Sequence, residues 1–505
     1  MTVLYLLLVQ RPTFVFSDAS TGWHLVTGQY ILDHLRVPHR DLISYTHADK
    51  AWVPYEWLFD VVAALLVRAG GLPLLAVVTA SAIAFLFALL YRDARRRGLQ
   101  FHIALAITLT GALASSIHWL ARPHLVTFFG VYIFAGCLEA LHRNQMSALG
   151  AGGALAVTMA AWSNAHPAFI IGFAMVLIYL AAEAVAAMTL PPGEARAGAR
   201  ARTAALAGIL VTVLAASLLN ASGVSLYPYI AALLRAAPLR SSITEWMSPV
   251  FGGQLYGVCL ELLFAAIVIG LAASRRRLWL GQLLLLLAFA HLALSAARNV
   301  PLFVIVAIPV AADLLAQADI RTLIGAGGRS PDRIGAAAAY WRRLAATFDA
   351  MERLCTMHLV PIATVVVLAS SCVAATHVRG APALVSSGFD PRDVPTTTLT
   401  YVTRAGLRWD RGLALDNWGG YIRYETGQRV FVDDRLDFYG SAFIQRYRQT
   451  LGAGPGWNTL LDEYGIAWVL VPRSTPLAGA LEQTTGWRLA AADAAADLFV
   501  RSPAR

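Results

Sequence analysis

The feature that most constrains this chain is a series of apolar runs, each about 20 residues long, which is the length that crosses a bilayer as a helix. Hydrophobic residues make up 58% of the chain and charged residues only 14%, whereas a soluble protein carries about a quarter charged residues. We therefore predict a polytopic α-helical membrane protein. The predicted spans lie near residues 72–91, 101–119, 125–141, 148–163, 168–189, 203–219, 255–273, 279–297, 302–317 and 358–377.

Two further apolar segments affect the number of spans. Met1–Phe16 is interrupted by Arg11 and Pro12 and lacks the cleavage site of a signal peptide. It is either a short first crossing, which gives about 11 spans, or the remainder of a segment that starts upstream. The segment 56–69 is short and carries Asp60 and Arg68. We predict a helix that lies on the membrane surface there, with a twelfth crossing as the alternative.

The positive charges predict the topology. Basic clusters at 92–97, 142–143, 196–202, 275–277 and 321–353 all fall on one side of the predicted membrane, and the positive-inside rule makes that side cytoplasmic. The net charge of +10 is explained in this way, so nucleic acid is not expected as a partner. A surface helix at 56–69 keeps all five clusters on the same side, and a crossing there does not.

The predicted topology divides the chain into two domains. Residues 1–377 form the transmembrane domain, with 17–71 as its first outer loop, and 378–505 form an extracytoplasmic α/β domain. In the tail we predict strands at Val430–Val432 and Ala467–Val471, helices at Ser441–Leu451 and Asn458–Tyr464, and turns at Gly419–Gly420 and Gly465. The cytoplasmic stretch 318–357 is predicted as a glycine-rich linker, Gly325–Gly328, followed by an amphipathic helix, Ala336–Arg353.

Motifs of soluble enzymes do not explain this chain. It contains no phosphate-binding glycine loop, no His-Glu-x-x-His and no Cys-x-x-Cys. Its four cysteines are scattered, so they predict neither disulfides nor a metal site. No cofactor is predicted, and a divalent metal is not indicated. Any chemistry has to be assembled from the outer loops, where ionisable groups near a membrane tend to be functional.

Three carboxylates in these loops are candidate catalytic groups. Asp18 follows the first apolar segment, and partial burial there would make it a general base; the alternative is that Asp18, Ser20 or Thr21 caps a helix over Trp23–Leu35. Glu56 and Glu245 are the other two candidates. For each of them the alternative is a favourable position in the first turn of a helix.

Two arginines on the same side favour an anionic ligand. Arg122 and Arg298 lie at the ends of spans, where arginine can grip a phosphate bidentately. The alternative for either one is snorkelling to the lipid headgroups. The neighbouring His124 and Asn299 favour a shared anion-binding pocket. His166, which follows Asn164, either caps a span or lines that pocket.

The arrangement of these motifs resembles the C-type, multi-span glycosyltransferases that use polyprenyl-phosphate-linked sugars, and in particular a large group of poorly characterised bacterial members. The motifs that carry the resemblance are Asp18–Leu25, Glu56-Trp57-Leu58, Arg122-Pro123-His124, Asn164-Ala165-His166, Arg298–Leu302, Trp418–Tyr421 and Asp433–Asp437. The tail also resembles the outer domain of oligosaccharyltransferases, where a Trp-Asp-Tyr-Gly segment precedes a strand and an Asp-Asn pair. Here Asp416–Tyr421 precedes Val432-Asp433-Asp434.

The resemblance implies a glycosyltransferase in the bacterial inner membrane. It would transfer a sugar, with inversion, from a polyprenyl-phosphate donor to a glycan, lipid or protein acceptor on the outer face, in contact with membrane lipids. Asp18 would be the base, and Arg122 and Arg298 would bind the leaving phosphate. The further substrate-binding residues that it implies are Trp23, His24, Trp418, Tyr421, Asp433, Asp434, Arg435 and Asp437. The alternative is a non-catalytic transporter or a lipid- or glycan-binding assembly protein.

Overall fold

The computed structural model describes most of the chain. The described residues are 13–48, 50–235, 244–318, 339–340, 343–350 and 359–502, with Tyr5, Val9 and Glu352. Most of the predicted first crossing, Met1–Phe16, lies outside them, although Phe14–Phe16 forms a short 3-10 helix, η1. The predicted linker Gly325–Gly328 also lies outside them. Within the predicted helix Ala336–Arg353, residues 343–350 are helical.

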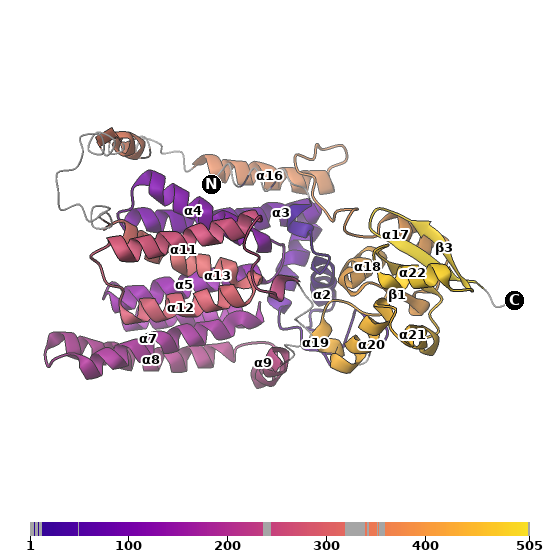
Figure 1. Cartoon of the computed structure of the whole chain (residues 1–505), viewed down its shortest axis with the longest axis horizontal. Coiled ribbons are helices and arrows are strands. Elements are labelled where there is room, and N and C mark those ends of the chain that lie inside the picture. Colours follow the sequence, from indigo (N-terminus) through magenta and orange to yellow (C-terminus); the bar gives the residue numbers. More distant parts are fainter. Residues whose placement is uncertain are drawn as a thin grey trace.

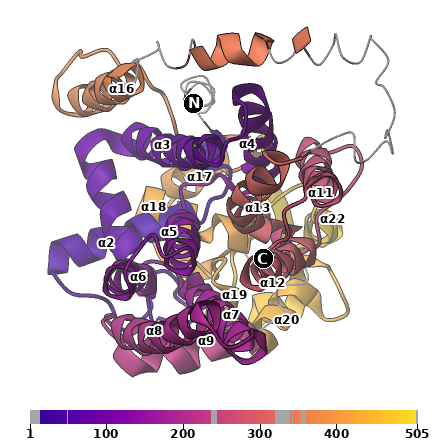
Figure 2. The ribbon, with the colours of Figure 1, turned by 90° about the vertical axis from the view of Figure 1, so that its left-hand side faces the viewer.

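Long apolar helices run side by side and form a bundle at one end of the molecule (Figures 1 and 2). In the described part, eight helical stretches are long and apolar enough to cross a membrane, and two apolar helices, α6 and α12, are shorter. The helices are α3 (Trp57–Arg96), α4 (Phe101–Ser115), α5 (His124–His142), α6 (Ala148–Ser163), α7 (Ile170–Thr189), α8 (Glu194–Ser217), α11 (Leu255–Ala273), α12 (Leu280–Ser295), α13 (Val300–Leu315) and α16 (Leu359–His377).

The predicted spans correspond to these helices, with one clear difference. Helices α6 and α11 have the predicted bounds. Helix α8 begins at Glu194 rather than near residue 203, because the arginine-rich stretch before it is helical. Arg202 of this stretch donates to the Glu183 carboxylate on α7 at 2.8 Å. The ion pair lets the charged turns continue the helix rather than form a loop.

Helix α3 contains the break that separates the predicted surface helix from the next span. Gly70 and Gly71 depart from helical geometry, and Gly71 has a φ of +69°, a conformation that glycine adopts without steric cost. The segments on either side correspond to the predictions for 56–69 and 72–91. Whether the first of them lies on the membrane surface stays a prediction.

Two shorter helices flank the bundle. Helix α2 (Thr21–His34) closely matches the predicted helix over Trp23–Leu35. Helix α9 (Leu226–Arg235) lies in the segment 220–254, between the predicted spans 203–219 and 255–273, where no helix is predicted. The same segment contains a short 3-10 helix, η5 (Thr244–Trp246).

The basic clusters meet at one end of the bundle, as predicted from their charge. Asp313 of α13 is buried there. Its carboxylate lies 2.8 Å from Arg143 Nη2 and 3.2 Å from Arg276 Nη1, and it also accepts from Arg97. Three predicted cytoplasmic clusters therefore share one carboxylate. Which side of a membrane this end faces stays a prediction.

The tail contains a small four-stranded sheet at the opposite end of the molecule (Figure 1). The strand order is β1-β2-β4-β3; β1 pairs in parallel with β2, and the other pairs are antiparallel. The strands are β1 (Gly412–Ala414), β2 (Trp468–Val471), β3 (Trp487–Ala492) and β4 (Asp497–Arg501). The helices around them are α17 (Thr397–Arg404), α18 (Gly419–Thr426), α19 (Leu436–Tyr439), α20 (Ser441–Leu451), α21 (Trp457–Glu463) and α22 (Pro476–Gln483).

Most predicted elements of the tail are confirmed, and two are wrong. Strand β2 and helices α20 and α21 match their predictions, and Gly465 lies in the turn before β2 with a φ of +58°. The segment Val430–Val432 is not a strand: Val430 forms only an isolated bridge with Ser44, and the buried apolar side chains of this segment fill the core. Gly419–Gly420 is the start of α18 rather than a turn.

The first loop packs into the hydrophobic core of the tail. Ala19, Trp23, Ile43 and Trp52 belong to the same buried cluster as the side chains of the sheet. Helices α2 and α18 meet backbone to backbone, because a Cβ atom at Gly420 would lie 2.9 Å from the backbone nitrogen of Trp23. The domain division at residue 377 stays a prediction, and the tail core extends back into the segment 17–71.

Candidate active site

A cavity of about 680 Å³ lies where the first loop, the bundle and the tail meet. Polar side chains from these three parts line one side of it. Of the site residues predicted from the sequence, those that line the cavity are Asp18, Trp23, Glu56, Arg122, His124, His166, Glu245, Arg298, Asn299, Asp434, Arg435 and Asp437. The others, His24, Asn164, Trp418, Tyr421 and Asp433, lie outside it.

The two predicted phosphate-binding arginines belong to one ion-pair chain. Arg122 precedes α5, and its Nη1 donates to Asp18 Oδ2 at 2.6 Å and lies 3.9 Å from Glu245 Oε2. Arg298 precedes α13, and its Nη1 donates to the other Glu245 oxygen at 3.0 Å. The Arg298 guanidinium also lies over the Trp246 ring, 4.2 Å from its centroid. Two cations from separate helices are thus held beside the same carboxylate.

The charged groups of this ion-pair chain stabilise one another's ionised forms. Burial acts to lower the pKa of Arg122, but Asp18 and then Glu245 overcome it, so that pKa is raised. Burial acts to raise the pKa of Glu245, but Arg298 and then Arg122 overcome it, and the net result is a lowered pKa. Arg122 and Glu245 are therefore ionised near neutral pH. The cavity contains a preformed site of fixed positive charge, balanced by carboxylates.

Asp18 also contacts the start of α2 and the tail. Its Oδ1 accepts the backbone N–H of Ser20 at 2.8 Å. The Ser20 hydroxyl lies against both Asp18 Oδ1 and Asp434 Oδ2, although a hydroxyl donates only one hydrogen. Ser20 precedes α2, but its side chain does not cap the helix. The predicted cap is therefore wrong for Ser20, because its hydroxyl joins two carboxylates instead.

Asp434 and Glu56 are the cavity carboxylates whose protonation changes near neutral pH. Burial, and then the charge of Asp18, raise the pKa of Asp434 to about 7. Burial raises the pKa of Glu56 to about 8, although Arg122 and Arg298 oppose the shift. Glu56 is 8% exposed, directly before α3. A group with a pKa near the working pH is suited to general acid–base catalysis.

Two histidines stack beside Glu245. The rings of His118 and His124 have centroids 3.9 Å apart, and His124 Nε2 contacts the backbone oxygen of His118 at 2.8 Å. His118 Nδ1 lies 3.5 Å from Glu245 Oε2. His118 was not predicted as a site residue, because it lies inside the apolar run 101–119, which is predicted as a span.

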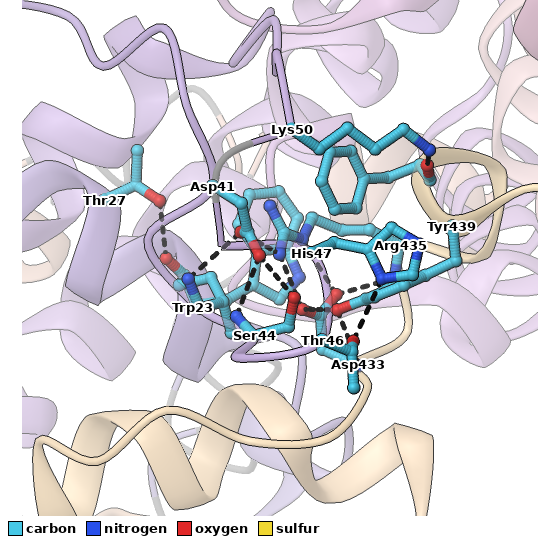
Figure 3. Close-up of polar contacts among 12 residues, drawn as sticks. Trp23, Thr27, Asp41, Ser44, Thr46, His47, Lys50, Asp433, Arg435 and Tyr439 are labelled. Carbon is cyan, nitrogen blue, oxygen red and sulfur yellow. Dashed lines mark hydrogen bonds and ion pairs between the residues drawn. The ribbon is translucent and has the colours of Figure 1, made fainter. Parts of the chain in front are cut away.

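Arg435 fixes the first loop to the tail at the edge of the cavity (Figure 3). Its Nη2 donates to Asp41 Oδ1 at 2.7 Å and to Asp433 Oδ2 at 2.6 Å. Its guanidinium lies 4.5 Å from the centroid of the Trp52 ring. Asp433 also accepts from Tyr439 at 2.7 Å. Asp433 thus holds the Arg435 guanidinium in place within the tail. Asp41 is the partner of Arg435 in the first loop, and Asp41 was not predicted as a site residue.

Three of the remaining predicted residues have structural contacts. Asn164 Oδ1 accepts from Trp57 Nε1 at 2.8 Å, and its Nδ2 donates to the Leu219 oxygen at 2.8 Å, so Asn164 joins α3 to the end of α8. Trp418 Nε1 donates to the Asp393 oxygen at 2.8 Å. The Tyr421 ring packs on Phe389 within the tail. None of the three lines the cavity.

Asp437 and Asn299 line the cavity and also have hydrogen-bond partners. Asp437 accepts from the Tyr229 hydroxyl at 3.2 Å, which joins the tail to α9. Asn299 donates to the Leu292 oxygen at 3.1 Å, beside Arg298. Burial raises the pKa of Asp437.

Part of the cavity wall is apolar. It is formed by side chains of α7, α9, α12 and α13, namely Ile170, Ile171, Ile230, Leu233, Leu234, Leu292 and Leu302. A cavity that combines an apolar wall with two arginine side chains fits an amphiphile with an anionic head. Among the residues that the structure describes, no group of three His, Cys, Asp or Glu side chains is arranged to hold a metal ion.

The fold is similar to that of two solved archaeal structures. One is the oligosaccharyltransferase AglB from Archaeoglobus fulgidus in complex with an inhibitory peptide and a dolichol-phosphate (TM-score 0.55), and the other is an Archaeoglobus fulgidus oligosaccharyltransferase in the apo form (TM-score 0.52). Both are 12% identical to this chain and match 90% of it. The chain spans only 65% and 66% of their lengths. No protein-family model and no curated protein matches the sequence.

Proposed function

We propose that the protein is a membrane glycosyltransferase. It moves a sugar from a polyprenyl-phosphate donor to a hydroxyl acceptor, which is a glycan, a lipid or a protein, at the cavity. The observation that carries this proposal is the pair of arginines beside Glu245, which line the same cavity as a group of apolar side chains. The dolichol-phosphate bound in one AglB structure supports a donor of the same chemical class.

In the proposed mechanism the donor phosphate lies against Arg122 and Arg298, and its lipid chain follows the apolar wall. The acceptor oxygen attacks the anomeric carbon on the face opposite the phosphate, so the configuration is inverted. The bond between the anomeric carbon and the phosphate oxygen breaks, and its electron pair stays on the phosphate. The arginines stabilise this developing charge, which is usually the largest catalytic contribution. A carboxylate of the cavity takes the acceptor's proton, and Asp18 is the one that the sequence predicts.

The proposed location is the bacterial inner membrane, with the cavity and the tail 378–505 on the outer face. The convergence of Arg97, Arg143 and Arg276 on Asp313, at the end of the bundle that carries the basic clusters, supports this orientation through the positive-inside rule. The proposed topology has about 11 spans, with the helix at 56–69 on the membrane surface.

The test is donor turnover by the purified chain in lipid nanodiscs. With a panel of polyprenyl-phosphate sugars and the corresponding acceptors, we expect release of polyprenyl phosphate. Arg298→Gln should slow that release by about 10² to 10³-fold, and the exposed Arg404→Gln should not change it. If no donor is cleaved, the proposal is refuted; donors that bind without cleavage would instead favour the non-catalytic alternative.

A further inference from the structure

A row of buried polar side chains extends from the cavity into the protein behind Glu56. It runs from Asp60 through His24 to Glu56, and from there through His166 to Thr127 on α5. His24 Nε2 lies 3.9 Å from Glu56 Oε2, and His166 Nε2 lies 3.7 Å from Glu56 Oε1. The two carboxylate oxygens of Glu56 therefore each face one imidazole ring.

The contacts of His166 identify its protonated nitrogen. Trp162 Nε1 donates to Thr127 Oγ1 at 2.8 Å, which leaves the Thr127 hydroxyl hydrogen free to reach His166 Nδ1, also at 2.8 Å. The backbone N–H of Ala168 donates to the same Nδ1 at 3.3 Å. Burial, and then Arg298 and Arg122, hold the pKa of His166 well below its ordinary value. The neutral ring thus carries its hydrogen on Nε2, toward Glu56.

His24 lies against the other oxygen of Glu56. Its Nδ1 lies 2.7 Å from Asp60 Oδ1. Its Nε2 faces Glu56 Oε2 at 3.9 Å and has no hydrogen-bond partner among the described residues. Burial, and then Arg122, hold the pKa of His24 well below its ordinary value. Glu56 therefore lies between two neutral imidazole rings.

The contact between His24 and Asp60 depends on a close approach of helices α2 and α3. A Cβ atom at Gly28 would lie 1.9 Å from the backbone oxygen of Asp60, so only glycine lets α2 pack so closely on α3. The His24 ring is held between Trp23, at a centroid distance of 3.6 Å, and Phe59, at 5.6 Å. His24 and Asp60 are both fully buried. The pair is thus rigid and shielded from water.

We propose that Glu56 is the general base of the cavity and that His24 and Asp60 position it. This proposal rests on the proposed function. The acceptor O–H gives its proton to Glu56 as the oxygen bonds to the anomeric carbon and the phosphate leaves. Glu56 keeps the proton until the products leave and the cavity is open to water again. Asp18, whose oxygens contact Arg122 and Ser20, holds the phosphate-binding arginine in place.

The charges around Glu56 set the expected pH dependence. Burial favours its protonated form, Arg122 and Arg298 favour its carboxylate, and Asp437 and Asp434 oppose the carboxylate. His24 and His166 are neutral. The pKa of Glu56, raised by burial to about 8, means that kcat/KM should rise with pH through about 8 and then level off.

The kinetic test compares pH profiles of kcat/KM for the polyprenyl-phosphate sugar that the wild type turns over fastest. Glu56→Gln should lower kcat/KM by about 10² to 10⁴-fold and remove the rise with pH, with donor binding unchanged. Asp60→Asn should shift the pH at which kcat/KM rises, and not only lower its value, as expected for a residue that positions Glu56. The exposed Glu482→Gln is the matched control and should keep the wild-type profile.

An infrared titration of the full chain provides a readout that needs no substrate. The carbonyl band of protonated carboxylic acids should weaken as the pH rises through about 7 to 8, because Asp434 and Glu56 both lose their protons there. In Glu56→Gln the loss should be smaller by the contribution of one carboxyl group. Wild-type turnover with a Glu56→Gln variant that keeps the rising limb, or an infrared loss as large in that variant as in the wild type, overturns the inference and leaves the proposed function standing. Absence of turnover by the wild type overturns both.

Discussion

Replacing Glu56 by glutamine should stabilise the protein, and the gain should grow as the pH rises. Burial raises the pKa of the Glu56 carboxyl from 4.5 to about 8 in the folded protein. Below about pH 4.5 the folded and unfolded chains both hold the proton, so the carboxyl makes no pH-dependent difference. Between about 4.5 and 8 the unfolded chain ionises first, and the stability falls as the pH rises. Above about pH 8 both states are ionised and the loss is complete.

The magnitude follows from the difference between the two pKa values. Each pH unit across this window corresponds to about 1.4 kcal/mol, which gives about 3 kcal/mol at pH 7 and about 5 kcal/mol above pH 8. Glutamine cannot ionise, so the Glu56→Gln variant should escape this loss. For a chain of 505 residues that unfolds as one unit, about 1 °C in Tm corresponds to 1 kcal/mol.

Thermal unfolding in nanodiscs at a series of pH values measures this effect. The quantity to compare is the Tm of Glu56→Gln minus that of the wild type, because the titration of Asp434 is common to both and cancels. Glu482→Gln should give no pH-dependent difference. A Glu56→Gln difference that stays constant from about pH 5 to about pH 9 would refute the assignment of a buried, protonated Glu56.

Three further substitutions test other parts of the structure. Arg122→Gln leaves the half-buried Asp18 without its cation and leaves Glu245 with Arg298 alone, so it should destabilise the protein, seen as a lower Tm; an unchanged Tm would contradict the ion-pair chain. Gly420→Val places side-chain atoms against the backbone of Trp23 and should make the tail sensitive to limited proteolysis, whereas wild-type resistance would contradict the close helix packing. Asp313→Asn leaves three arginines without their shared carboxylate and should also lower the Tm; no change would show that these arginines find other partners.

The sequence predicts the bundle well, because an uninterrupted apolar run has clear limits. Helices α6 and α11 match the predicted bounds for this reason. The start of α8 was predicted wrongly, since a charge-rich turn is indistinguishable from a loop until its partner, Glu183, is known. Helix α9 was missed because it is short and contains Pro228.

Some features of the tail and of the site depend on long-range contacts, and these features could not be predicted from the sequence. Val430–Val432 has the composition of a strand, but its neighbours leave room for only one bridge. Strand β3 is rich in alanine and gave no alternating pattern. In the site, most of the residues predicted from the sequence line the cavity. The pairing of His24 with Asp60 could not be predicted, because it joins two helices through the close contact at Gly28.

The packing of the first loop into the tail core also constrains how often the chain can cross a membrane. Two segments that share a hydrophobic core and the Asp41–Arg435 ion pair lie on the same side of any bilayer. In the proposed topology the number of crossings between residue 56 and residue 378 is therefore even. Eight long apolar helical stretches and two shorter ones lie between them in the described part, and ten single crossings satisfy the condition. A second crossing within α3, ahead of its glycine break, would make the number odd and pull the first loop away from the tail.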